Sequence, residues 1–364
     1  MLKKHADRVV LITTFILLVL GLVMLVSASS EPGKIKFNDT YYYIKHQLIY
    51  GFGPGLLGFL AGLFISYKNF KRLAFIFLLL NLAALTLVFV PSIGANLGAA
   101  DRWINIAGVT LQPSELLKFT FIVYLAAWLT SRTKNRKSDV AESFLPFLIL
   151  SGIIAFLLII QPSTSTVIIL MTAALIVYFI NGARISFIAG VILVGILGLG
   201  LVISLTPYRL QRITTFINPG IDLEGTRYHL NQSLITIGSG SVFGVGYGNS
   251  VSKIKYLPEP IGDSIFAVIA EELGFLGAIF FIGLFFILVM AGFLGSRNVR
   301  NQFGRLTVIG FSSVLAVQIF VHIAAISGMI PLTGVPLPFI SYGGTALATF
   351  MTMSGLTVNI LRNG

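Results

Sequence analysis

Residues 9–29 read VVLITTFILLVLGLVMLVSAS, an apolar run without a single charged side chain. The run is longer than the ~7–15 residues of a signal-peptide core, and many similar runs follow it along the chain. A bilayer core takes about 20 apolar residues per helix. We therefore expect residues 9–29 to form the first of several membrane-spanning helices, although the preceding MLKKHADR imitates the start of a signal peptide.

The composition agrees with a membrane protein. The chain has 364 residues, of which 56% are hydrophobic and only 10% charged, whereas a soluble domain carries about 25% charged residues. The absence of cysteine excludes disulfides, iron–sulfur clusters and thiolate zinc sites. Four scattered histidines give no pattern of a metal site. The net charge of +12 is explained by cationic loops against anionic lipid headgroups, so we expect no nucleic-acid partner.

The apolar runs predict an all-α polytopic membrane protein, with residues 1–364 forming one membrane domain. Measured against the bilayer, the runs give about ten spans. They lie near 9–28, 47–66, 73–91, 115–131, 143–160, 164–180, 185–205, 265–294, 307–326 and 343–361.

Lys and Arg residues predict the orientation, because they are enriched in short cytoplasmic loops. With a cytoplasmic N-terminus, fifteen of the 25 cations lie inside, and the C-terminus is cytoplasmic too. These fifteen are Lys3, Lys4, Arg8, Lys68, Lys71, Arg72, Arg132, Lys134, Arg136, Lys137, Arg184, Arg297, Arg300, Arg305 and Arg362.

The outer side has a long segment between spans 7 and 8, about residues 206–264, and long loops tend to be functional. Ten cations remain on this side, which favours an anionic ligand there. They are Lys34, Lys36, Lys45, Arg102, Lys118, Arg209, Arg212, Arg227, Lys253 and Lys255. Within the segment, GSGSVFGVGYGNS (238–250) superficially resembles a phosphate-binding loop. It lacks the preceding strand and the GKS or GKT ending, so we interpret it as a flexible or re-entrant loop.

Glu115 and Lys118 are three residues apart at the start of the fourth span, and hence on one helical face. An internal salt bridge would let both enter the membrane. A polar cleft in which this pair and Arg102 hold a phosphate is a second interpretation, compatible with the first.

The stretch YLPEPIGDSIFAVIAEELG, residues 256–274, places four acids at the mouth of the eighth span. Prolines keep Glu259 in the loop. Asp263 lies at the helix start, where a cap would explain it, but an acid at a membrane boundary is by default a functional candidate. Glu271 and Glu272 lie two turns further along and point about 100° apart. We expect these two to be structural partners within the bundle.

Several motifs together resemble the SEDS family of polytopic membrane proteins, which includes FtsW, RodA and SpoVE. They are RWI…QPSELLK, YHLNQSLITIGSG, GNS, YLPEP…D…FAVIAEELG and PLPFISYGG, in the family's order over most of the chain. GNSVSKIKYLPEP is closer to FtsW than to RodA. The resemblance implies a peptidoglycan glycosyltransferase for cell division or cell shape. It would polymerise lipid II on the outer face of the bacterial cytoplasmic membrane, with a class B penicillin-binding protein and other divisome or elongasome membrane proteins as partners.

Residue by residue, the resemblance makes Asp263 the essential acid and matches Arg102, Glu115 and Lys118 to family positions. Two departures lie close to the site. The family's His-Thr-Asp before Phe-Ile-Phe is here Ile261-Gly262-Asp263 followed by Ser264, and its QPD ends here in Ser163.

The expected reaction is an inverting displacement at a sugar C1, with Asp263 as general base and undecaprenyl diphosphate as leaving group. A diphosphate needs charge neutralisation rather than protonation, and Arg102, Lys118 and Lys255 would supply it, with Glu115 orienting Lys118 and Glu259 facing substrate. A divalent cation, Mg²⁺ or Mn²⁺, at Asp263 and Glu259 stays open, although no ligand spacing indicates one. The alternatives are a lipid II flippase, since ten spans and intramembrane charges also suit a transporter, and a non-catalytic scaffold for a penicillin-binding protein.

Overall fold

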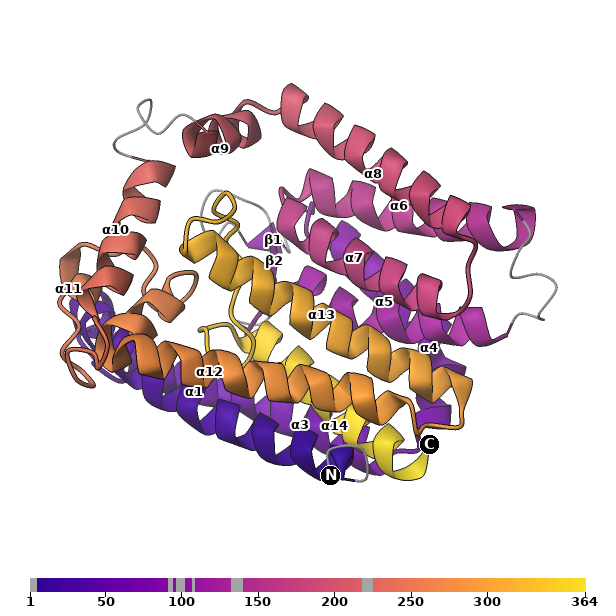
Figure 1. The fold of residues 1–364 in the computed structure, drawn as a ribbon, viewed down its shortest axis with the longest axis horizontal. Coiled ribbons are helices and arrows are strands. Elements are labelled where there is room, and N and C mark those ends of the chain that lie inside the picture. The colour runs from indigo at the N-terminus through magenta and orange to yellow at the C-terminus, as the bar shows by residue number, and fades with distance from the viewer. Residues whose placement is uncertain (1–4, 91–93, 96–101, 107–108, 132–139, 218–224) are drawn as a thin grey trace.

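The structure is a computed structural model that describes residues 5–90, 94–95, 102–106, 109–131, 140–217 and 225–364. It is almost entirely helical, as the sequence predicts (Figure 1). Of the cations expected inside, Lys3, Lys4, Arg132, Lys134, Arg136 and Lys137 lie outside the described residues.

The helices follow the predicted spans closely, because the bilayer thickness sets the length of each apolar run. Their bounds are α1 Ala6–Phe37, α2 Tyr42–Gln47, η1 Leu48–Phe52, α3 Gly53–Phe64, α4 Tyr67–Leu87, α5 Pro113–Thr130, η3 Val140–Phe144, α6 Leu145–Ile160, α7 Thr164–Ile180, α8 Ile185–Leu205, α9 Pro207–Ile217, α10 Thr226–Ser239, α11 Ser252–Lys255, α12 Ile265–Ser296, α13 Gln302–Ile326 and α14 Gly344–Asn363. Here η1 and η3 are π-helical, and α2, η1 and α3 form one continuous run.

Eight of the described helices are long and apolar enough to cross a membrane. Helix α7 is a shorter apolar helix, and α5, which carries Glu115 and Lys118, coincides with the expected fourth span. The chain is therefore a multi-pass membrane protein, while the count of ten spans stays a prediction. Large apolar side chains on the outside of the bundle, such as Leu197 and Phe286, are 64% exposed, as lipid-facing residues would be.

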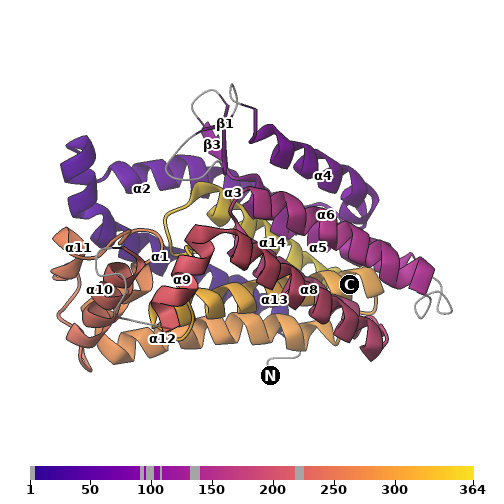
Figure 2. The same cartoon turned by 90° about the horizontal axis from the view of Figure 1, so that it is seen from above.

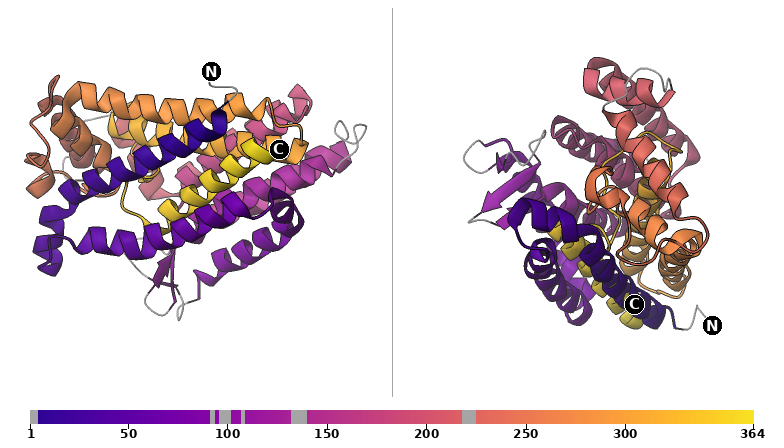
Figure 3. Two further views of the ribbon diagram at one scale, coloured as in Figure 1. Left: turned by 90° about the horizontal axis from the view of Figure 1, so that it is seen from below. Right: turned by 90° about the vertical axis from the view of Figure 1, so that its left-hand side faces the viewer.

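Helices distant in sequence pack along their lengths. Helix α1 lies against α12 and α14, and α14 also packs on α3 (Figures 1 and 3). The Arg362 Nε atom lies 2.9 Å from Asp7 Oδ2. Both chain ends therefore lie at the same end of the bundle.

The described parts of the segment 206–264 lie at the opposite end, where α9, α10 and α11 are found (Figure 1). A small antiparallel sheet, which the sequence analysis did not predict, lies beside the start of α5 (Figure 2). Its strands are β1 Gly94–Ala95, β2 Trp103–Ile106 and β3 Val109–Leu111, with Ile104 paired to Leu111. Because β3 runs almost directly into α5 and Arg102 immediately precedes β2, the sheet places Arg102 near Glu115.

Helix α12 is interrupted at Gly274, where φ is 69° and ψ is −169°. The turn 241–246 fills this break. Its amides at Val245 and Gly246 donate to the last carbonyls of the outer part of α12, each at 3.0 Å, and its carbonyls accept from the first amides of the inner part at 3.0 and 3.2 Å. The turn thus satisfies backbone groups that a membrane would leave unpaired. Its amides at these two positions are already bonded, as expected for a loop that does not cradle phosphate.

Candidate active site

Asp263 lies in the turn 258–264, directly before α12. The Ser264 hydroxyl donates to the Pro258 carbonyl at 2.7 Å, and the Ser264 amide donates to the Glu259 carbonyl at 3.1 Å. Glu259 itself has φ 47°, in the left-handed region, which costs a non-glycine residue about 1–2 kcal/mol. The turn is therefore held in a specific shape, with Glu259 exposed and Asp263 partly buried.

The loop 327–343 closes over this turn. The Ser341 hydroxyl donates to the Gly262 carbonyl and the Tyr342 amide to the Ile261 carbonyl, both at 2.8 Å. At Gly334, where φ is +64°, a Cβ atom would lie 3.1 Å from Asp263 Oδ2. Gly334 thus allows the loop backbone to approach the carboxylate closely.

The larger cavity has a volume of about 550 Å³. It is lined by the Ser163–Thr166 turn, by the mouth of α5 at Gln112 and Glu115, and by Asp263. Three arginines also line it: Arg102, Arg209 and Arg212. The three arginines outnumber the two acidic side chains, Glu115 and Asp263, which makes this cavity suited to an anion.

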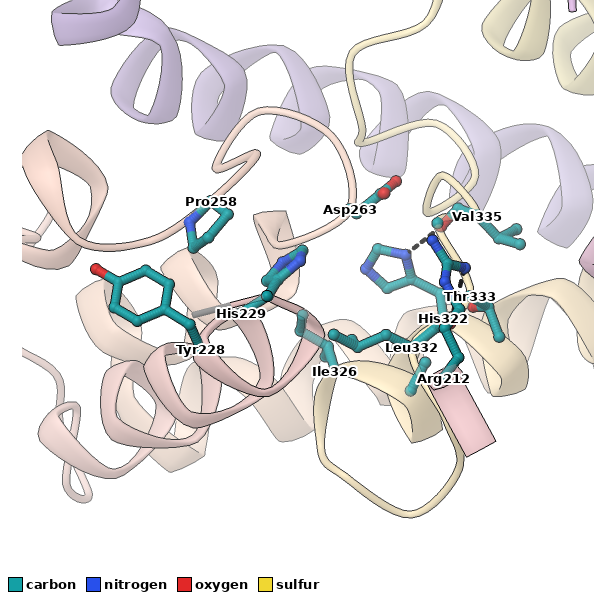
Figure 4. A pocket seen from close by; sticks show the side chains of 13 residues that line it. Arg212, Tyr228, His229, Pro258, Asp263, His322, Ile326, Leu332, Thr333 and Val335 are labelled. Atoms are coloured by element: carbon teal, nitrogen blue, oxygen red, sulfur yellow. Dashed lines mark hydrogen bonds between the residues drawn. The ribbon is translucent and has the colours of Figure 1, made fainter. Parts of the chain in front are cut away.

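A smaller cavity of about 300 Å³ shares Asp263, Arg212 and the segment 332–335 with the larger one. Its other polar lining comes from α10, with Tyr228 and His229, and from α13, with His322 (Figure 4). Asp263 therefore faces two cavities of different chemistry.

Burial raises the pKa of the Asp263 carboxyl to about 6, and the nearby Glu259 carboxylate adds to the rise. The positive charges of Arg212 and Arg102 oppose it. At pH 7 the group is thus mainly ionised, yet its pKa lies close enough to neutrality for it to take up a proton.

Arg102 is fixed to the turn that follows α6. Its Nε donates to the Gln161 carbonyl at 3.1 Å and its Nη2 to the Pro162 carbonyl at 2.6 Å. The family motif ends there in an acid where this chain has Ser163, whose hydroxyl lies 3.2 Å from the Thr166 hydroxyl. The carbonyls of Gln161 and Pro162 therefore hold Arg102 in place, although this chain lacks the acid that the family has at the position of Ser163.

Glu115 and Lys118 form the predicted buried pair, with Lys118 Nζ 2.6 Å from Glu115 Oε1. Lys118 is fully buried and also donates to Gln318 Oε1 at 2.7 Å, while Gln318 donates in turn to the Pro336 carbonyl at 2.8 Å. Glu115 lines the larger cavity, but Lys118 is not among the described residues that line either cavity. The pair thus links α5 to α13 and to the loop over Asp263.

Lys255, a predicted substrate-binding residue, is exposed at the end of α11 and is not among the described lining residues of these two cavities. The buried lysine of this region is Lys253. Its Nζ lies 2.7 Å from Glu272 Oε1 and 2.8 Å from Ser27 Oγ. The sequence analysis selected Lys255 and not Lys253, because a partner that identifies the buried lysine, Ser27, lies far away in the sequence on α1.

Glu271 and Glu272 are both buried and hydrogen-bonded, which confirms their predicted structural role. Glu271 accepts from the Ser250 hydroxyl and, at 3.0 Å, from the Ser252 hydroxyl, whereas Glu272 binds Lys253. The two acids thus use different partners, as their divergent directions require.

Sequence reasoning did not select four residues that line the cavities. Arg209 and Arg212 were recognised only as outer cations, although their spacing of three places them on one face of α9. His229 lies in the family motif YHLNQSLITIGSG but was not selected, and its pairing with His322 was not recognisable, because the two lie 93 positions apart in the sequence. Among the described residues, no three His, Asp or Glu side chains are grouped so that they could hold a metal ion.

The chain is similar to known proteins over nearly its whole length. A family model described as "Cell cycle protein", FtsW/RodA/SpoVE, matches residues 7–364. Stage V sporulation protein E of Bacillus subtilis is 35% identical, and the alignment covers 99% of this chain and 98% of that protein. A Trichlorobacter lovleyi protein named probable peptidoglycan glycosyltransferase FtsW is 36% identical, with 97% of this chain and 92% of that protein covered.

Solved structures show the same fold. The crystal structure of the rod shape determining protein RodA of Thermus thermophilus has a TM-score of 0.69 and 26% identity, covering 97% of this chain and 94% of RodA. A chain in a structure described as "Structural coordination of polymerization and crosslinking by a peptidoglycan synthase complex" has a TM-score of 0.77 at 24% identity, covering 97% of both chains.

Proposed function

Because this chain belongs to the FtsW/RodA/SpoVE family, we propose that it is a peptidoglycan glycosyltransferase that polymerises lipid II. The reaction would take place at the outer face of the bacterial cytoplasmic membrane, with both chain ends in the cytoplasm. The names of its relatives support the activity. The observation that carries the proposal is the position of Asp263, which faces an arginine-lined cavity and is held there by two loops.

In the proposed reaction, a hydroxyl oxygen of the acceptor sugar attacks C1 of a lipid-linked sugar. The new O–C1 bond forms as the bond from C1 to the diphosphate oxygen breaks, with inversion at C1. Asp263 takes the hydroxyl proton, and undecaprenyl diphosphate leaves with the bonding electrons. General base catalysis of this kind contributes about 10²–10⁴-fold.

The leaving diphosphate would lie among Arg102, Arg209 and Arg212, whose charges stabilise the negative charge that develops on it. Glu115 lines the same cavity, and Lys118 acts through it by holding Glu115 in place. Glu259 and Lys255, both exposed, would meet the substrate at the outer surface. A Mg²⁺ or Mn²⁺ ion between Asp263 and Glu259 is the alternative way to neutralise charge. Chelation with EDTA separates neutralisation by arginines from neutralisation by a metal ion. If the arginines act alone, the rate of glycan formation is unchanged by EDTA.

Replacing Asp263 by Asn tests the base assignment. We expect Asp263→Asn to lower the rate of glycan formation from lipid II by at least about 10²-fold, since the amide cannot accept the proton. Purified protein reconstituted with lipid II and analysed for glycan length gives the measurement. The matched control is Asp39→Asn, because Asp39 is an outer acid that pairs only with the exposed Lys45 among the described salt bridges.

Loss of activity in this variant should not reflect unfolding. The pKa of Asp263 is raised from its ordinary value of 3.8 to about 6. The ionised carboxylate therefore destabilises the fold fully above pH 6, and this cost disappears as the pH falls below 3.8. Asp263→Asn should accordingly keep or raise the melting temperature at pH 8. Wild-type rates in the Asn variant would show that another group is the base.

The same reconstitution separates the three functional classes. Glycan formed by the wild-type chain indicates the enzyme, and movement of lipid II across the bilayer without glycan indicates a flippase. The absence of both indicates a scaffold or a missing partner protein. The proposed partner is a class B penicillin-binding protein, with other division or elongation proteins beside it. A structural neighbour that belongs to a peptidoglycan synthase complex supports this arrangement.

A further inference from the structure

The smaller cavity is lined by a histidine, one of whose ring nitrogens is buried without a hydrogen-bond partner among the described residues. His322 is 2% exposed, and its Nδ1 atom lies 2.6 Å from the Val335 carbonyl oxygen. Because a carbonyl can only accept, Nδ1 carries the proton, and Nε2 of the neutral ring is left as an acceptor. Nε2 is buried and has no hydrogen-bond partner among the described residues. An unpaired buried acceptor of this kind destabilises the protein unless a ligand donates a hydrogen bond to it.

A second imidazole lines the same cavity with one nitrogen committed. His229 Nε2 lies 2.6 Å from the Ser264 hydroxyl oxygen, and that hydroxyl donates to the Pro258 carbonyl at 2.7 Å. Since the single hydroxyl proton goes to Pro258, Ser264 accepts from His229 Nε2–H. Burial and the charge of Arg212 lower the pKa of His229, so the ring is neutral at pH 7 and its Nδ1 is an acceptor.

The two cavities on either side of Asp263 therefore differ in what they can bind. The larger one has three arginines and suits an anion. The smaller one offers the Asp263 carboxylate and two imidazole acceptors, with Arg212 as its shared cation (Figure 4). An acceptor-rich wall repels a diphosphate but fits a ligand with several O–H or N–H donors. The volume of about 300 Å³ lies at the lower end of small-ligand pockets, about 300–1,000 Å³.

We propose that the smaller cavity is the subsite for the acceptor sugar, and that His322 Nε2 and His229 Nδ1 accept hydrogen bonds from its hydroxyl and acetamido groups. The inference rests on the proposed glycosyltransferase function and deepens it. The sugar enters on the histidine side of Asp263, so its attacking hydroxyl meets the carboxylate from there. The diphosphate of the other substrate occupies the arginine side.

Binding of two simple probes tests this division without requiring turnover. The probes are the neutral disaccharide of N-acetylglucosamine, for the histidine cavity, and inorganic pyrophosphate, for the arginine cavity. Saturation-transfer NMR on the full chain in lipid nanodiscs measures both. We expect His322→Phe and His229→Phe to weaken disaccharide binding by about tenfold each, the loss of one hydrogen bond of about 1.4 kcal/mol, while pyrophosphate binding stays unchanged. Arg102→Gln and Arg209→Gln should give the reverse pattern.

A conservative variant separates recognition from packing. In His322→Gln the side-chain amide oxygen reaches toward the position of Nε2, so disaccharide binding should recover to within about threefold of wild type. The assignment is overturned if wild-type protein binds no disaccharide, if the Phe variants bind it as wild type does, or if the Gln variant loses it while retaining pyrophosphate. If the Phe variants bind neither probe, the His322→Gln variant decides: recovered disaccharide binding supports the assignment, and loss of disaccharide binding alone overturns it. Failure of the wild-type chain to form glycan would instead count against the proposed function, and would leave the binding result unaffected.

Discussion

Asp263 differs from the other acids of its stretch in what surrounds it. Glu271 and Glu272 are paired with hydroxyls and with Lys253, and Glu259 is exposed. Asp263 instead faces two cavities, and its pKa of about 6 reflects burial against partial compensation by arginines. Its position before a helix was evident from the sequence. The sign of its pKa shift was not, because it depends on how burial and charge balance in three dimensions.

The pH dependence of the reaction should report this pKa. A general base must be deprotonated, so the rate should be constant above pH 7, half-maximal near pH 6, and fall about tenfold per unit below that. Initial rates of glycan formation at saturating lipid II between pH 4.5 and 8.5 give the profile. The melting temperature over the same range serves as the control. An inflection near pH 4, the value of an ordinary carboxyl, would contradict the buried-base assignment.

At the scale of the element, most spans were predicted to within a few residues and the connections were not, while α1 continues to Phe37 although its predicted span ends at 28. The seventh expected span and α8 share the bounds 185–205, because bilayer thickness fixes the length of an apolar run. The segment 206–264 has no apolar run of fixed length from which its helices could be predicted. Its helix α10 and its turn 241–246 are positioned by contacts with α12, and α9 is held by Arg209 and Arg212, which donate to the carbonyls of Ile159 and Leu332. Such distant pairings leave no periodic pattern in the sequence.

The break in α12 gives the sharpest test at this scale. Gly274 has a positive φ, and a Cβ atom there would lie 2.5 Å from the Val242 carbonyl oxygen. Gly274→Ala should therefore destabilise the protein by more than the 1–2 kcal/mol of left-handed strain, which thermal unfolding in detergent would detect. The matched control is Gly283→Ala in the same helix, where a Cβ would meet nothing within 4 Å. Equal effects of the two substitutions would mean that the break is unimportant.

The whole molecule places its two chain ends together and its candidate site at the opposite end, beside α9 to α11 (Figures 1 and 3). This polarity agrees with the orientation expected from the lysines and arginines. Charge alone gives a prediction of which end faces the cytoplasm, but it could not predict which of the expected outer cations converge. Arg102, Arg209 and Arg212 come from two separate segments that only the fold brings to one cavity.

The orientation can be measured because the chain contains no cysteine. Val251→Cys lies in the outer segment, with 63% of Val251 exposed, and Asn298→Cys lies in the exposed connection between α12 and α13. A membrane-impermeant maleimide added to intact cells should label the first variant alone, and should label both after permeabilisation. Labelling of Asn298→Cys in intact cells would reverse the proposed orientation.

The break at Gly274 also bears on how the protein tolerates different membranes. The inner part of α12, from residue 275 to Ser296, is about 33 Å long, close to the thickness of a bilayer core. A thicker or thinner bilayer is accommodated by tilting such a helix. The turn 241–246 is bonded both to this inner part and to the outer part, which begins beside Asp263. Because this turn bridges the break, we expect a change in the tilt of the inner part to act on the segment beside Asp263 through the turn 241–246.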